Sequence, residues 1–175
     1  MNVLSLAHDR APRLAAVLAF TALAMLVPVS VAQTPVSDTG DGPHPAHIHS
    51  GTCAALGDVV IPLADVAFPA GDQVGAASAF PLKISTNFVV EMPLQEIIDG
   101  EYAINIHQSA EEIDVYIACG DIGGVLTKEG EDGPDELRFA LGELNESGHT
   151  GVVFLSAQGD QTEVNIMLIE PGEFS

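Results

Sequence analysis

The chain has 175 residues, of which 25 are acidic and five are Lys or Arg, so its formal net charge is −20 at pH 7. Such an acidic surface repels nucleic acid and anionic lipid, which excludes both as expected partners, and it attracts cations. Solubility and adaptation to salt are alternative explanations of the same charge.

The first 32 residues are typical of a secretory signal. Arg10 and Arg13 precede an apolar run over residues 14–27, and Ser30-Val31-Ala32 is a small-x-small cleavage site. That run is shorter than the roughly 20 residues that span a bilayer, which favours removal over an uncleaved anchor. We therefore expect a secreted, periplasmic or extracellular protein with no membrane span after signal removal.

Without residues 1–32 the chain has 143 residues, 24 acidic and three basic, a net charge of −21. This length is sufficient for one domain with a hydrophobic core. Residues 33–43 are rich in Thr, Pro, Ser, Asp and Gly and predict a flexible linker. Residues 44–175 contain no internal repeat, and we expect them to form a single domain.

The first predicted elements are short. Residues 59–66 form a β-branched run, which Pro62 confines to a sheet edge or a bulge. Residues 80–90 predict one or two strands with a turn near Asn87. Residues 93–100 predict a single helical turn that begins at Pro93 and ends at Gly100.

The remaining segments predict further strands. Residues 101–107 and 113–119 alternate most clearly, with Ile113, Val115, Ile117 and Cys119 on one face of the second. Residues 128–136 predict an acidic loop. Residues 137–141, 152–157 and 164–169 complete the set, with a hairpin at 159–160. The pattern predicts an all-β fold, an antiparallel β-sandwich of Greek-key, dismutase-like or immunoglobulin-like type, or a small barrel.

Histidines provide the main candidate site. Residues 43–53 contain His44, His47 and His49, half of the six histidines. If this segment is extended, His47 and His49 project to one face, since side chains alternate along a strand. His107 ends a strand in which Ile104 and Ile106 take the opposite face. We therefore expect His47, His49 and His107 to bind copper or zinc, since imidazole is a common ligand for both.

Alternatives to this metal site stay open. The three histidines can instead lie on a solvent-exposed sheet face and bind no metal. His44 and His149 are further candidate ligands of lower rank, and the Ser-Gly-His-Thr-Gly context of His149 predicts an exposed turn.

The chain has two cysteines, Cys53 and Cys119. In an exported protein the simplest expectation is a disulfide, which would hold the histidine-bearing segments close together. Thiolate ligation of copper or zinc is the alternative.

Residues 46–51 and 105–107 carry a family resemblance. The chain resembles the chordin-type (CHRD) domain, in which an Ala-His-Ile-His-x-Gly segment precedes an Asn-x-His strand. It is also similar to copper/zinc superoxide dismutase, with its His-x-His copper strand and its disulfide. The chain also resembles secreted bacterial proteins that have a similar His-rich start and an Ile-Ala-Cys-Gly-Asp segment, here residues 117–121. These resemblances imply a metal-binding β-sandwich module.

Several features argue against dismutase activity. The chain lacks a zinc loop with further His and Asp, and the only late histidine is His149. A net negative chain with Arg138 as its one remaining arginine does not attract superoxide. Dismutation is therefore the enzyme alternative, and a structural or adhesive domain without metal is the third.

Overall fold

The computed structural model describes residues 42–172, except 73, 77 and 129. The predicted signal and most of the predicted linker lie outside the described residues. Within these residues no helix is long and apolar enough to cross a membrane.

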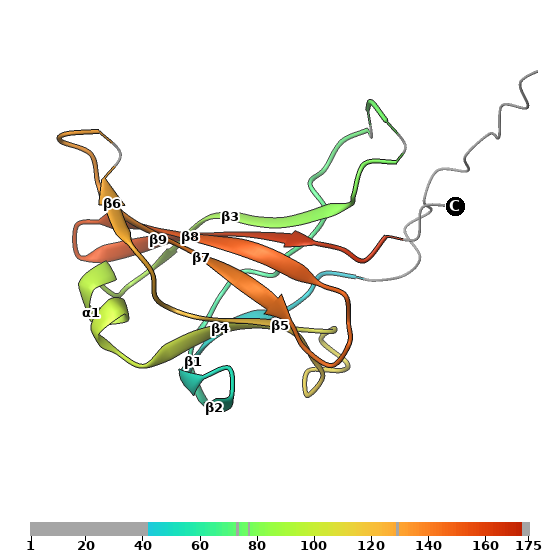
Figure 1. Ribbon diagram of the computed structural model, residues 1–175, viewed down its shortest axis with the longest axis horizontal. Coiled ribbons are helices and arrows are strands. Elements are labelled where there is room, and N and C mark those ends of the chain that lie inside the picture. Colours follow the sequence, from blue (N-terminus) through green and yellow to red (C-terminus); the bar gives the residue numbers. More distant parts are fainter. Residues whose placement is uncertain (1–41, 73, 77, 129, 173–175) are drawn as a thin grey trace, which may run out of the picture. The chain divides into compact units, whose positions relative to one another are not determined.

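The described residues are mainly antiparallel strands with one short helix (Figure 1). The strands are β1 (Ala46–Thr52), β2 (Ala55–Pro62), β3 (Leu82–Val90), β4 (Tyr102–His107), β5 (Tyr116–Asp121), β6 (Leu126–Lys128), β7 (Asp135–Glu143), β8 (Thr150–Gln158) and β9 (Gln161–Ile169), and the helix is α1 (Leu94–Asp99).

Hydrogen bonds connect the described strands in the order β2-β1-β4-β5-β7-β8-β9-β3, with β6 beside β7. The sheet curls, so that the part with β1, β4 and β5 lies across from the part with β3, β9, β8 and β7 (Figure 1). The all-β class is confirmed, while the sandwich and Greek-key topology stay predictions.

The core lies inside the curl, and burial alternates along β8 and β9, whereas β4 and β5 are buried on both faces. In β9, Val164, Ile166 and Leu168 are buried, and in β8, Val153 and Leu155 are buried. Burial of each such side chain stabilises the fold by about 1.5–3 kcal/mol. The same alternation continues just before the start of β8 and just after the end of β9, where two polar residues described below are buried.

Residues 66–67 pair with His44, just before β1, and with β3 at the other end of the strand order. Val66 pairs with His44, and Ala67 pairs with Ile84 of β3. Backbone hydrogen bonds of 2.8–3.1 Å connect both pairs. Residues 66–67 therefore bridge the two sides of the curl at the end where His44 lies.

Most predicted elements are present. β2 ends the hydrogen-bonded path, as expected from Pro62, but it covers residues 55–62 where a strand over 59–66 was predicted. Pro93 directly precedes α1. The predicted turn at Asn87 is instead a bulge inside one strand, where Asn87 has φ 58° and the β3–β9 register shifts. Asn tolerates this left-handed conformation better than most residues do.

The predicted strands differ from the structure in two further places. Ile113 and Val115 precede β5 in the β4–β5 connection, and their side chains are 38% and 41% exposed. The amide of Val115 donates to the Glu112 carbonyl, which makes a turn where alternation predicted a strand. β6 was not predicted, because its three residues lie beside the acidic stretch 128–136.

Candidate metal centre

Strand alternation places three histidines on the sheet face opposite the core. Ile48 of β1 packs in the core, so His47 and His49 take the other face. His47 pairs directly with Asn105 of β4, and His107 lies two residues further along the same face. This outer cluster, defined as His47, His49 and His107, therefore follows from the register of β1 against β4.

The three rings meet closely. The Nδ1 atom of His47 lies 2.7 Å from Nε2 of His107. Ring centroids are 4.6 Å apart for His47 and His107, 5.8 Å for His47 and His49, and 5.9 Å for His49 and His107. One ligand atom from each residue lies within 4.8 Å of the others. The predicted triad is thus brought together in the structure.

Backbone carbonyls fix the tautomers of two rings. A carbonyl only accepts, so Nδ1–H of His49 donates to the Gly57 oxygen at 3.0 Å, and Nδ1–H of His107 donates to the Ile113 oxygen. Nε2 of each neutral ring then carries the lone pair. Such second partners orient ligating histidines in metal sites. Nε2 of His49 is buried and has no hydrogen-bond partner among the described residues.

His47 completes the arrangement in the absence of metal. Because Nε2 of His107 is an acceptor, Nδ1–H of His47 donates to it. Metal–nitrogen bonds of about 2.0–2.1 Å separate two tetrahedral ligands by about 3.3–3.4 Å. A shared ion would therefore require this pair to open by roughly 0.6 Å from its 2.7 Å contact and His47 to carry its proton on Nε2.

The electrostatics favour neutral imidazoles, the form that binds metal. Burial lowers the pKa of His47, and the neighbouring His49 lowers it further, against an opposing effect of Asp65. Burial also lowers the pKa of His107, although its hydrogen bond to Ile113 acts in the opposite direction. Neutral nitrogen ligands bind a cation without first losing a proton.

The outer cluster is enclosed. His49 and His107 are 4% and 3% exposed, and the ring of Tyr116 lies 5.1 Å from that of His107. Asn105 is fully buried beside them, with Nδ2 3.5 Å from Nε2 of His107. The alternative of histidines on a solvated face is therefore wrong for two of the three.

The cysteines form the expected bridge. Cys53 and Cys119 are joined, with Cα atoms 5.8 Å apart. Cys53 directly follows β1, and Cys119 pairs with Asn105 of β4, so the bridge lies on the face that carries the outer cluster. With both sulfurs in the disulfide, thiolate ligation of a metal is excluded in this structure.

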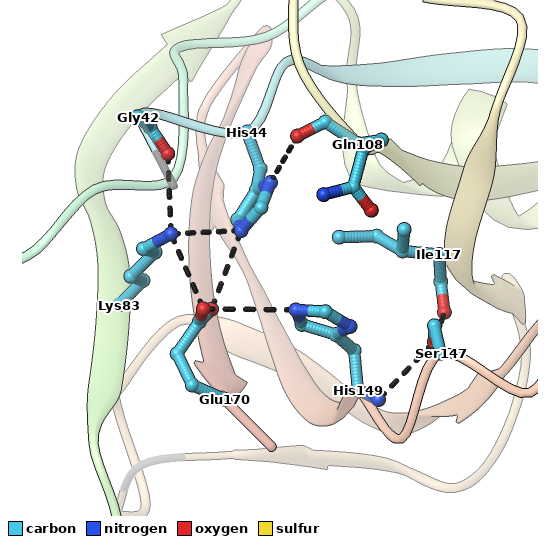
Figure 2. Close-up of polar contacts among 8 residues, drawn as sticks. All are labelled: Gly42, His44, Lys83, Gln108, Ile117, Ser147, His149 and Glu170. Atoms are coloured by element: carbon cyan, nitrogen blue, oxygen red, sulfur yellow. Dashed lines mark hydrogen bonds and ion pairs between the residues drawn. The ribbon is translucent and has the colours of Figure 1, made fainter. Parts of the chain in front are cut away.

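The other two candidate histidines form a second group. His44, Lys83, His149 and Glu170 gather on the core face of the sheet, and we name them the inner cluster (Figure 2). The prediction that His149 lies in an exposed turn was wrong, since it is 4% exposed. It continues the inward alternation of Gly151, Val153 and Leu155 in β8, although residues 147–151 have a turn-like composition.

A lysine ammonium lies inside this cluster. Nζ of Lys83, whose side chain is 1% exposed, lies 2.8 Å from Nε2 of His44 and 3.2 Å from Oε2 of Glu170. It also donates to the Gly42 carbonyl at 3.1 Å and faces the ring of Phe68 at 5.0 Å. The buried cation is thus compensated by one carboxylate and several neutral acceptors.

Glu170 is the anion of the inner cluster. Burial raises the pKa of its carboxyl, but the adjacent side chains of His149 and His44 and the charge of Lys83 together hold that pKa well below its ordinary value. Oε2 lies 3.6 Å from Nε2 of His149, beyond hydrogen-bonding distance. Glu170 is therefore ionised at neutral pH.

Sequence reasoning missed Lys83 and Glu170, although a signal was present. Glu170 is in phase with the buried Val164, Ile166 and Leu168 of β9, one step beyond the end of the strand. A charged residue that continues a buried face marks a buried polar site, because such residues are rarely enclosed without partners.

Comparison with known proteins finds no matching family model, no matching curated protein and no matching solved structure. The fold and clusters define an all-β, disulfide-bonded protein with two His-rich groups that could each hold a metal ion. The similarity to chordin-type domains and dismutases stays an expectation carried by two short segments.

Proposed function

We propose that the chain is an exported metal-binding module that holds copper or zinc through His47, His49 and His107. The observation that carries the proposal is the orientation of His49 and His107, whose Nδ1–H groups donate to backbone carbonyls. Both rings thereby turn Nε2 lone pairs towards the same region as His47. The disulfide and the signal-like start support export, since disulfides persist in oxidising compartments.

The donor set favours a borderline ion over a hard one. Three imidazoles suit copper or zinc, whereas calcium and magnesium prefer oxygen ligands. For the same nitrogen donors, Cu²⁺ binds more tightly than Zn²⁺. We therefore expect copper to displace zinc, with the charge of −21 on the exported chain raising the local concentration of either ion.

A binding role is favoured over dismutation. The late histidine that would be a fourth copper ligand, His149, groups with His44 and Glu170 instead of the outer cluster. Within the described ranges, no fourth His, Cys, Asp or Glu joins His47, His49 and His107. Dismutation stays the enzyme alternative. A purely adhesive domain gives no reason for enclosing an unpartnered nitrogen of His49.

The test is a calorimetric titration of the exported protein with Cu²⁺ and Zn²⁺. His47→Ala and His107→Ala should each weaken the tightest binding phase by at least about 100-fold, because two imidazoles hold such ions far less well than three. His149→Ala is the matched control, since it removes a buried histidine outside the outer cluster and should retain that phase. Equal, weak binding by all variants would refute the proposal.

A further inference from the structure

We propose that His44, His149 and Glu170 form a second site for a divalent transition-metal ion, most suited to zinc, and that Lys83 competes with the ion for it. This site lies on the core face of the sheet and shares no ligand with the outer cluster. Lys83 makes the inner site weaker than the outer one.

One ligand atom from each of His44, His149 and Glu170 lies within 4.8 Å of the other two. Nε2 of His44 lies 3.4 Å from Oε1 of Glu170, and Nε2 of His149 lies 3.6 Å from Oε2. Ligands at about 2.0–2.1 Å from a tetrahedral zinc ion are about 3.3–3.4 Å apart. The two distances involve different oxygens of Glu170, so an ion held through one of these oxygens would require a shift of the carboxylate or of one ring.

The donor atoms are oriented and in part unused. Nδ1–H of His44 donates to the Gln108 carbonyl at 2.7 Å, which leaves the Nε2 lone pair directed into the cluster (Figure 2). Both ring nitrogens of His149 and Oε1 of Glu170 are buried without a hydrogen-bond partner in the described part of the chain. Buried polar atoms are usually satisfied, so the unused Nε2 of His149 and Oε1 of Glu170 indicate a ligand in the cluster.

The chemistry of the set indicates zinc. Two imidazoles and one carboxylate form a frequent zinc donor set, with a fourth position filled by water or another group. Glu170 also supplies a negative charge that the outer cluster lacks. This charge strengthens the attraction of the inner site for a divalent ion such as Zn²⁺.

Lys83 acts as the competing cation. Its ammonium donates to Nε2 of His44, the same lone pair that an ion would take. Figure 2 shows the Glu170 carboxylate between Lys83 on one side and His149 on the other. When an ion binds, Lys83 must release His44, but it keeps the Gly42 carbonyl and the Phe68 ring as partners. Like charges at this range repel, so Lys83 lowers the affinity.

The experiment uses the exported protein with His47→Ala and His107→Ala, in which the outer site is disabled. Titration with Zn²⁺ should show one equivalent bound, and Co²⁺ should give the visible bands of a tetrahedral site. Adding His149→Gln should weaken this binding at least about tenfold, whereas adding Lys83→Met should strengthen it by about tenfold, one decade being 1.4 kcal/mol.

The outcomes separate this site from the outer one. Absence of zinc binding in the His47→Ala/His107→Ala protein, with or without Lys83→Met, would overturn the inner site and leave the outer site standing. Binding that His149→Gln does not change would also overturn it. Circular dichroism of each variant shows whether it is folded, and Lys83→Met keeps the test decisive if His149→Gln fails to fold.

Discussion

Replacement of Glu170 by Gln is expected to destabilise the metal-free protein strongly. The change preserves shape but removes the carboxylate that faces Lys83, whose side chain is 1% exposed. The ammonium then remains buried with only neutral acceptors. Leaving a buried charge without its partner is one of the few single-residue changes that destabilise a protein strongly.

The magnitude follows from the contact. Opposite unit charges 3.2 Å apart attract by about 5 kcal/mol at an effective dielectric constant of about 20. Breaking a buried pair by removing one partner costs about 3–5 kcal/mol. Because Gln keeps an oxygen acceptor and Lys83 keeps Gly42 and Phe68, we expect the lower end, about 3 kcal/mol.

The assay is urea unfolding at pH 7 with a chelator present, so that metal does not contribute. Lys83→Met and the double variant Lys83→Met/Glu170→Gln complete a double-mutant cycle. The double variant should be more stable than Glu170→Gln, because no charge is left unpaired. A loss below about 1 kcal/mol in Glu170→Gln, or additive effects in the cycle, would refute the reasoning.

The same carboxyl predicts a pH dependence with a definite sign. Its folded pKa lies below the ordinary value of 4.5, so its contribution to stability is full above pH 4.5 and is lost as the pH falls below that value. The difference in unfolding free energy between the natural protein and Glu170→Gln should therefore shrink in acid. A difference that stays constant from pH 7 to pH 3 would contradict this.

The remaining predictions concern the bridge, the outer cluster and the core. Replacing Cys53 and Cys119 by Ala opens a loop of 66 residue steps and should lower the free energy of unfolding in urea by about 4 kcal/mol. It should also weaken metal binding, and unchanged stability would contradict the stabilising role of the disulfide. Burial lowers the pKa of His47 and His107, so in titration calorimetry protonation of these two rings should weaken zinc binding only at a lower pH than their ordinary pKa implies. A loss of affinity already at pH 7.5 would contradict this. Leu155→Ala should cost about 2–5 kcal/mol by the same unfolding assay, because the side chain is fully buried, and a cost below 1 kcal/mol would place it outside the core.

Local periodicity predicted the outer cluster well. His47 and His49 share a face because side chains alternate along any strand, and His107 follows from the same rule applied to β4. The sequence did not reveal that this face is enclosed. Enclosure comes from the β4–β5 connection and from β2, whose carbonyls at Ile113 and Gly57 accept from the rings. Such contacts depend on the course of the connecting segments, which the periodicity of the sequence does not predict.

Local periodicity could indicate that Glu170 and His149 are buried, but it could not predict that the inner cluster assembles. His44, Lys83, His149 and Glu170 belong to four chain segments that meet only through the β3–β9 and β8–β9 registers and the bridges of residues 66–67. His149 was assigned to an exposed turn from its neighbours, since Ser, Gly and Thr are frequent in turns. Its burial follows instead from the phase of β8.

The two clusters depend on a single register, that of β1. His44, Ala46 and Ile48 point to the core, and His47 and His49 point away, so β1 and the residues just before it supply ligands to both faces. A slip of one residue would exchange these sets and place His47 and His49 among apolar side chains. The disulfide opposes such a slip, because Cys53 follows β1 directly while Cys119 pairs with Asn105, the partner of His47. The bridge therefore fixes the alignment from which both histidine groups arise.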